Sequence, residues 1–300
     1  MKNILSVILL CVVFPGVSQN YFDFVSLTYI NTPANDFELS KGDTNVEELN
    51  VELNFPVVLN KKTILLTGLF ANRTKVGLDA NLPSSNLQTL GLNIGINKTF
   101  NDVWSATFMV YPKIAADELK LSSDNLQVGF LSLFTKKKRA NLKYKYGAFL
   151  NTEKFGLLVL PVFGLYYLSP NKKFEANLTL PIRADVTYKL NEKFWMGFRF
   201  DGIGTSYNLN DQNYSNNGAY VSKASIEMTP YLRFKVSKSL YINTKLGYAF
   251  SRNYRVFNAD DKIDLAVTSI YLGDARTQLN ENFLDGGIFK IELLYRLHFD

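Results

Sequence analysis

The sequence is poor in the residue types that most often carry chemistry. It contains one cysteine, Cys11, one histidine, His298, and two tryptophans in 300 residues. A single cysteine excludes an intrachain disulfide. A single histidine excludes metal sites built from several imidazoles and leaves His298 as the one candidate imidazole base.

Long hydrophobic runs are also lacking after the first residues. An apolar stretch from Ile4 to Phe14 follows Lys2, and Pro15-Gly16 then interrupts it before the small residues that end at Ser18. This pattern predicts a secretory signal peptide over residues 1–18, because a membrane-spanning helix needs about 20 apolar residues. Cleavage would remove Cys11 and leave a single domain over residues 19–300.

The sequence is rich in aromatic residues and has an excess of basic over acidic residues. It holds 23 Phe and 17 Tyr, with 47% hydrophobic and 20% charged residues and a formal net charge of +6. This composition is typical of a folded chain rather than a disordered one. The densest basic run, at residues 136–139, has no interleaved aromatic side chains, so we expect a solvated turn or contact with anionic lipid and no nucleic-acid partner.

Alternation of apolar and polar residues is the dominant pattern after residue 20. Leu49, Leu53 and Phe55, for example, alternate with Glu48 and Glu52. A period of two predicts β-strands, since successive side chains of a strand point to opposite faces. We expect strands near residues 22–30, 46–59, 62–72, 87–99, 103–111, 125–135, 142–150, 156–168, 173–180, 184–190, 193–206, 219–236, 239–256 and 286–299.

The predicted connections alternate between short polar turns and longer loops. Pro181 lies within the apparent strand 174–190, and because proline cannot donate to a strand ladder we split that strand at residues 180–183. The split gives an even count with both termini on the short-turn side. The prediction is an all-β fold: a closed antiparallel up-and-down transmembrane β-barrel of about 12–14 strands, with 14 favoured.

The polar face of these strands mixes Gly, Asn, Ser and Thr with charges of both signs. A membrane barrel places its apolar set toward lipid and its polar set toward the lumen. Such a lumen is either water-filled or sealed by ion pairs, and the sequence leaves both open. The charged residues that we expect to face it are Glu48, Glu52, Lys143, Lys145, Glu175, Asp185, Arg199, Asp201, Lys223, Glu227, Arg233, Lys245, Lys290, Glu292 and Arg296.

One segment carries a family resemblance. The run "LPVFGLYYLSPNKKFEANLTLPIRADVTYKLNEKFWMGFRF", from Leu160 to Phe200, has a Pro-x-x-Gly-x-x-Tyr strand, a short turn, a strand ending in Leu-Pro and a Val-x-Tyr strand. It resembles uncharacterised outer-membrane β-barrel proteins of Bacteroidota, a family with a domain of unknown function. The resemblance implies the fold and a location in the outer membrane of a Gram-negative bacterium, and it assigns no activity to any residue.

The last strand resembles the C-terminal signal by which barrel-insertion machinery recognises its clients. Its apolar set ends in an aromatic residue, and the departure from the pattern is Asp300, which follows that residue. The residues of this predicted insertion signal are Phe289, Ile291, Leu293, Tyr295, Leu297 and Phe299.

The function that these features favour is a passive porin-like channel for small solutes. The alternative is a non-channel structural or surface-binding barrel, with a salt-bridged closed lumen and external loops that contact a partner. We expect no enzyme activity and no catalytic, cofactor or metal site, since His298 falls at the predicted periplasmic end. The expected partners are outer-membrane lipid and lipopolysaccharide, the insertion machinery and small solutes.

Overall fold

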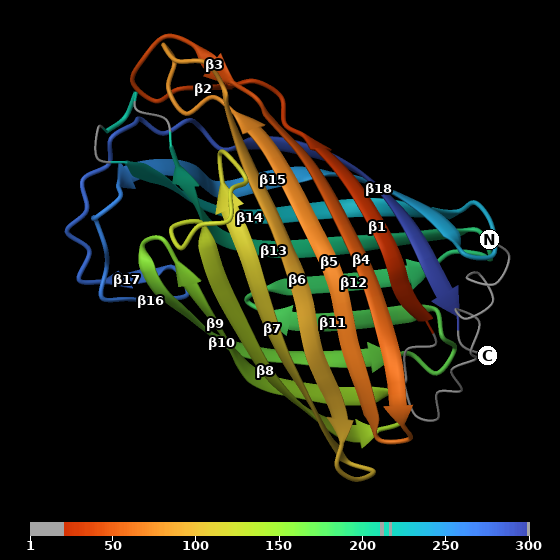
Figure 1. Cartoon of the computed structure of the whole chain (residues 1–300). Coiled ribbons are helices and arrows are strands. Elements are labelled where there is room, and N and C mark those ends of the chain that lie inside the picture. The colour runs from red at the N-terminus through yellow and green to blue at the C-terminus, as the bar shows by residue number, and fades with distance from the viewer. Residues whose placement is uncertain (1–20, 211–212, 216–217, 299–300) are drawn as a thin grey trace, which may run out of the picture.

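The computed structural model describes residues 21–210, 213–215 and 218–298, and the chain forms a closed antiparallel barrel of 14 strands (Figure 1). The predicted signal peptide and Phe299 lie outside the described residues. Within the described residues, no helix is long and apolar enough to cross a bilayer.

The barrel strands follow one another around the wall in chain order. They are β1 (Tyr21–Asn31), β4 (Val46–Asn60), β5 (Thr63–Val76), β6 (Ser85–Thr99), β7 (Trp104–Ala116), β8 (Leu126–Arg139), β9 (Leu142–Glu153), β10 (Gly156–Leu168), β11 (Phe174–Leu180), β12 (Arg183–Lys189), β13 (Phe194–Leu209), β14 (Ala219–Lys235), β15 (Leu240–Asn258) and β18 (Gly286–His298). Two short hairpins lie in loops: β2 (Asn35–Asp36) with β3 (Asp43–Thr44), and β16 (Leu265–Val267) with β17 (Ile270–Leu272).

The first and last strands close the ring. β1 pairs antiparallel with β18, with Tyr21 opposite His298, so both described ends of the chain lie at the same rim. β11 pairs with β10 and β12 with β13, which completes the wall on the other side. The predicted split at Pro181 and the predicted strand count of 14 are therefore confirmed.

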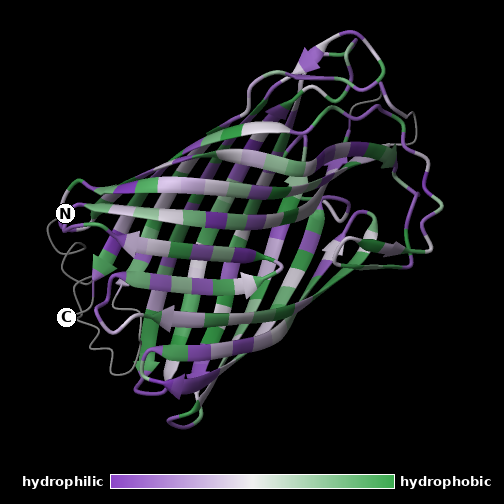
Figure 2. Cartoon of the chain, turned by 180° about the vertical axis from the view of Figure 1, so that it is seen from behind, coloured by the Kyte–Doolittle hydropathy of each residue, from purple (hydrophilic) through white to green (hydrophobic). Residues whose placement is uncertain are grey.

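The outer surface is apolar, as the alternation predicts for a strand face in lipid. Leu246, Phe163 and Ile291 are 66%, 62% and 44% exposed, whereas the residues beside them in sequence face inward. Figure 2 shows hydrophobic and hydrophilic positions alternating along the strands. Exposed aromatic side chains such as Trp104 and Phe194 lie near the short turns, where a barrel meets the lipid head groups.

Asparagine shapes several of the short turns. The Oδ1 atom of Asn101 accepts hydrogen bonds from the backbone N–H groups of Val103 (3.0 Å) and Trp104 (2.9 Å). Asn191 and Asn60 cap their turns in the same way. This side-chain mimic of a turn needs no loop, so the strands reverse tightly at this rim, which we call the turn end; the opposite rim is the loop end.

The wall is uneven in height. β11 and β12 have 7 residues each, whereas their neighbours β10 and β13 have 13 and 16. Pro181 and Ile182 alone connect β11 to β12, so this connection is a tight turn partway up the wall.

Other strands run further toward the loop end than the alternation predicts. β5 reaches Val76, β7 reaches Ala116 and β13 reaches Leu209. In these extensions several inward-facing side chains are apolar, as at Val76, Ala115 and Leu209, so the apolar-out, polar-in pattern breaks down there. The alternation therefore does not mark the loop-end extensions of these strands.

A charge on the outer face tests the placement of that face in lipid. Leu293, midway along β18, is 37% exposed and faces outward, and Leu297 lies on the same face two outward positions closer to the turn end. We expect Leu293→Arg to lower the free energy of unfolding by about 2–4 kcal/mol and Leu297→Arg by about 0–1 kcal/mol, because the cost of an arginine grows toward the bilayer midplane. Urea unfolding in lipid vesicles measures both, and equal costs would contradict this placement.

Candidate functional site

The charged residues predicted to face the lumen surround one central cavity of about 630 Å³. Two of the fifteen do not line it. Lys143 lies nearer the turn end with its ammonium 6.0 Å from the ring centroid of Tyr166, and Lys223 is buried above the cavity. The predicted residues that line the cavity are Glu48, Glu52, Lys145, Glu175, Asp185, Arg199, Asp201, Glu227, Arg233, Lys245, Lys290, Glu292 and Arg296.

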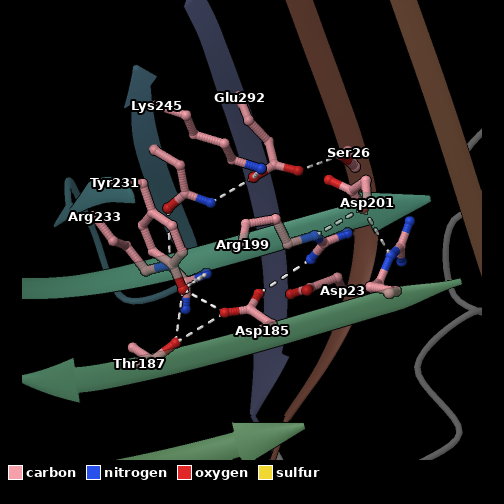
Figure 3. Close-up of polar contacts among 12 residues, drawn as sticks. Asp23, Ser26, Asp185, Thr187, Arg199, Asp201, Tyr231, Arg233, Lys245 and Glu292 are labelled. Atoms are coloured by element: carbon pink, nitrogen blue, oxygen red, sulfur yellow. Dashed lines mark hydrogen bonds and ion pairs between the residues drawn. The ribbon is translucent and has the colours of Figure 1, made fainter. Parts of the chain in front are cut away.

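Ion pairs link neighbouring strands around this cavity. Arg199 of β13 bonds to Asp185 of β12 (3.1 Å) and to Asp201 of its own strand (3.0 Å). Lys245 of β15 bonds to Glu292 of β18 at 2.9 Å. Figure 3 shows these pairs pointing into the same space from adjacent strands. Most of the charge is thus neutralised locally, which offsets the desolvation that each ion would otherwise suffer.

Neutral side chains extend the network between the pairs. The hydroxyl of Tyr231 donates to Asp185 at 2.7 Å and lies 2.6 Å from the hydroxyl of Thr187. The guanidinium of Arg233 donates to Asn243 at 2.8 Å, and the Asn243 amide donates to Glu292 at 2.5 Å (Figure 3). A continuous polar lining results, with hydroxyl and amide groups beside both signs of charge.

A second tier of pairs lies closer to the loop end. The Lys223 ammonium is 2.6 Å from Glu48, and the Tyr254 hydroxyl donates to the same carboxylate at 3.1 Å. Lys290 bonds to Glu227. Lys223 and Glu48 are 4% and 6% exposed, so this pair is sealed from bulk water and forms the upper limit of the cavity.

Three strands leave the wall above this tier. Residues 203–209 of β13, 219–225 of β14 and 252–258 of β15, which we call the inner sheet, are paired with one another, and β13 also bridges to β7 at Asn208 and Ala116. β7 and β13 are not neighbours in the wall, so this bridge spans the lumen. Five consecutive residues of β14, 219–223, are buried, which requires cover on both faces of the strand.

A β-bulge marks the point where the inner sheet bends. Ser251 and Arg252 of β15 together oppose one residue of β14, and Ser251 has a φ of 49°. The carboxylate of Asp285 accepts hydrogen bonds from both of their backbone N–H groups, at 2.8 Å each. A bulge adds twist and bends its strand. Asp285 therefore fixes the bend that carries the inner sheet into the barrel.

Apolar packing covers both faces of the inner sheet. On one face, Tyr207, Leu209 and Val221 pack against Val76 and Leu87 of the β5–β6 wall. On the other face, a second cluster joins β14 and β15 to β10 and to the loop of residues 259–285. It consists of Phe155, Leu158, Tyr220, Phe257, Ile263 and Ala266. The loop end of the lumen is thus filled by a hydrophobic core.

The strap, residues 259–285, crosses the loop end and carries β16 and β17. Its Arg276 guanidinium lies 4.3 Å from the Phe257 ring centroid and 5.1 Å from that of Tyr271. The same group donates to the Asp274 carboxylate at 2.8 Å and to the Tyr220 hydroxyl at 3.3 Å. This aromatic cage fixes the strap to the inner sheet.

The turn end of the cavity is narrow. The Arg296 guanidinium bonds to Asp23 at 2.6 Å and lies 3.5 Å from the ring centroid of Tyr21. The Tyr21 hydroxyl reaches Glu175 of β11 at 3.4 Å, across the lumen from β1. His298 lies beyond this group, 2.9 Å from the Tyr241 hydroxyl.

The arrangement supports binding of a hydrated or charged small molecule. A volume of about 630 Å³ is in the range of small-molecule sites. Within the described part of the chain, no group of three or more His, Cys, Asp or Glu residues could hold a metal ion. The alternation of apolar and polar residues does not mark Asp23, Asp285 or Arg276. Asp23 lies at the start of a strand, and the other two lie in a long loop, where side chains do not alternate.

The outward-facing residues of the predicted insertion signal lie where the alternation places them. Ile291, Leu293, Tyr295 and Leu297 are 44%, 37%, 43% and 36% exposed, and Phe289 is half-buried. Their exposure describes a lipid-facing strand; recognition by insertion machinery remains a prediction.

The buried Lys223–Glu48 pair gives a sharp stability test. We expect Glu48→Gln to cost about 3–5 kcal/mol, because it leaves a buried ammonium without its counter-ion. The double variant Glu48→Gln with Lys223→Met should recover most of that loss, since no unpaired charge remains. The urea midpoint in lipid vesicles reports both variants, and a double variant as unstable as the single one would contradict the assignment.

Acidification should loosen the strap. The hydrogen bonds from Arg276 hold the pKa of Asp274 below its ordinary value, and burial opposes them to a smaller extent. A carboxylate with a lowered pKa stabilises the folded state above its unfolded pKa of about 3.9, and that stabilisation is lost as pH falls through the lowered pKa. The protection factors for amide hydrogen exchange of residues 273–276, which correct for the intrinsic pH dependence of exchange, should therefore fall below about pH 4 in the native chain, and Asp274→Asn should show low protection factors at every pH.

Comparisons with known proteins identify the family. Solved structures with a similar overall path include an outer-membrane channel from Pseudomonas putida F1 (10% identity, 91% of this chain and 94% of that chain, TM-score 0.49). Others are the P. putida toluene transporter TodX (10%, 93% and 90%, TM-score 0.40) and the translocator domain of the autotransporter NalP from Neisseria meningitidis (8%, 92% and 89%, TM-score 0.40). No curated protein sequence matches the chain. A family model covers residues 18–263, and the chain therefore belongs to the family described as "Domain of unknown function (DUF6268)".

Proposed function

We propose that this protein is a porin-like outer-membrane channel for small solutes, with the inner sheet as a gate that is closed in this structure. The observation that carries the proposal is the charged central cavity inside a barrel with an apolar exterior. Small solutes and outer-membrane lipid are the partners that this function requires, and it requires no chemical step.

The lining supports a transport role over a purely structural one. Replacing buried ion pairs by apolar residues of similar volume is often neutral or stabilising. A barrel needed only for its shape therefore gains nothing from Arg199, Lys245 and Lys290 with their carboxylate partners. Water and a polar solute, in contrast, need such groups along their path.

The lining also bears on selectivity. Acidic and basic side chains alternate around the cavity, as at Asp185, Arg199 and Asp201, so no broad field of one sign crosses it. We therefore propose a path for polar solutes of either sign with weak charge selectivity.

The gate proposal rests on how the inner sheet is held. One hydrogen-bonded bridge joins β13 to β7 across the lumen, and the Asp117 backbone N–H donates to the Asn208 carbonyl at 3.0 Å. Polar contacts also join the inner sheet to the wall: the Glu153 carboxylate accepts hydrogen bonds from the Ser206 backbone N–H (2.6 Å) and hydroxyl (2.5 Å). The Lys113 ammonium donates to the Thr205 hydroxyl at 2.7 Å. Together with apolar packing, such side-chain contacts can separate and reform without breaking a strand ladder of the wall. Movement of the inner sheet toward the wall would join the cavity to the loop end.

The second candidate is a closed barrel that acts by its surface. The observation that favours it is the apolar core at the loop end, where Val76, Val221 and Val256 have no exposed surface. A barrel of this kind would stay sealed under all conditions and present the strap to an external partner.

A disulfide lock distinguishes the two candidates. The variant with Ala116→Cys and Asn208→Cys places thiols at paired positions of β7 and β13. In planar bilayers we expect openings from the native chain, no openings from the oxidised double variant, and openings again after reduction. Each single cysteine variant under the same oxidant is the matched control. The absence of openings from every form would contradict the channel and favour the closed barrel.

A further inference from the structure

The short β11–β12 hairpin leaves the wall incomplete above it. Strand β11 pairs with residues 163–168 of β10, and β12 pairs with residues 195–201 of β13. Nearer the loop end, β16 pairs with β10 at Leu158 and Val159. Between these two levels, residues 160–162 of β10 and 203–204 of β13 have a ladder partner on one side only, and no ladder joins β10 to β13 within the described sheet. We call this break in the hydrogen-bonded wall the side gap.

Little side-chain bulk fills the side gap on the β13 border. That border carries Gly202 and Gly204, and Gly204 is exposed. A Cβ atom added at Gly204 would have only Leu158 Cδ2 within 4 Å, at 3.8 Å. By contrast, a Cβ at Gly202 would collide with the Pro181 carbonyl, because the hairpin tip packs against it. The opening therefore lies above the tip.

The central cavity reaches the hairpin tip and the β13 border of the side gap. Its lining includes Ile182 and Arg183 at the hairpin tip and Gly202 and Ile203 on β13. The Arg183 side chain is 52% exposed, whereas that of Arg199, one strand further along the lining, is 14% exposed. The charged lining is thus more accessible at the hairpin tip than at Arg199.

The side gap lies at the height of the lipid-facing band. On β10 the outward residues Leu157 and Phe163 are 42% and 62% exposed, and they flank the level of residues 160–162. Leu180 at the hairpin tip is 43% exposed. An opening bordered by lipid-facing side chains above and below faces hydrocarbon rather than water.

Two cations converge on the inner side of the hairpin tip. The Lys145 ammonium reaches across Gly164 to β11, where it donates to Asn177 at 2.5 Å and Thr179 at 3.2 Å. Thr179 is paired with Arg183. Both partners of Lys145 are neutral, and within the described residues it makes no ion pair, whereas the Arg183 guanidinium shares Asp201 (3.4 Å) with Arg199.

We propose that the side gap is a lateral portal for a single-chain anionic amphiphile in the outer leaflet. Its acidic head would enter beside Ile182 and bind Lys145 and Arg183, and its alkyl chain would lie outward past Gly204 among the lipid-facing residues. The cations match the head, and the apolar border matches the chain. This binding step stands on the geometry of the side gap, and onward passage rests on the proposed channel function.

The test uses dodecanoate as the probe and the full chain in lipid nanodiscs, with binding followed by titration calorimetry. We expect Lys145→Gln and Arg183→Gln each to weaken dodecanoate binding at least ten-fold. Lys143→Gln, which removes the next inward cation on the same strand, should leave binding unchanged. Dodecyltrimethylammonium, with the same chain and the opposite charge, should bind no more tightly to the native chain than to these variants.

A steric variant tests the route itself. Gly204→Trp should block dodecanoate binding, whereas Gly204→Ala should not, because a methyl group fits the space beside Leu158. Heat-modifiable migration on gels verifies that each variant is folded. Equal binding by Lys145→Gln, Arg183→Gln and Lys143→Gln, or unchanged binding by a folded Gly204→Trp, would overturn the portal. The two proposals can fail separately. Dodecanoate binding without openings in planar bilayers would contradict only the proposed channel function. Openings without dodecanoate binding would contradict only the portal.

Discussion

Closure of the backbone hydrogen-bond ring is the constraint on which the rest of this structure depends. A strand in hydrocarbon has no water to satisfy its N–H and C=O groups, so every edge must be paired or covered. The β1–β18 and β10–β11 ladders meet this need near the turn end. Near the loop end the short β11–β12 hairpin interrupts the ring. Outside the side gap, three features pair or cover the strand edges there: β16 pairs with β10, the inner sheet packs inside the wall, and the strap covers the inner sheet.

The same compensation separates the lumen into two zones. Toward the turn end the inward face is charged, and ion pairs such as Lys245–Glu292 surround a polar cavity between strands. Toward the loop end the inward face is apolar, and Tyr207 and Val221 pack against the opposite wall as in a soluble β-sandwich. In the proposed channel, the polar cavity would hold a solute and the apolar inner sheet above it would act as the gate.

Asp285 and Arg276 hold the inner sheet and the strap in the arrangement of this structure. Asp285 holds the bulge that directs β15 inward, and Arg276 ties the strap to Tyr220 and Phe257. Each acts through a few polar contacts over a larger apolar interface. Such interfaces have discrete packed arrangements rather than a continuum, so a small change at either residue can favour a different position of the inner sheet.

The sequence by itself determined the number of strands and, outside their loop-end extensions, which face of each strand is apolar. Alternation such as Leu49–Phe55 against Glu48–Glu52 depends only on the period of a strand and on lipid outside it, and Pro181 marked the split because a proline cannot donate to a ladder. Tertiary structure alone decided the pairing of Lys223 with Glu48, the bridge between Ala116 and Asn208, and the gap above Ile182. Those features join residues that are distant in the chain, and their positions follow from strand lengths and a bulge, which leave no periodic trace in the sequence.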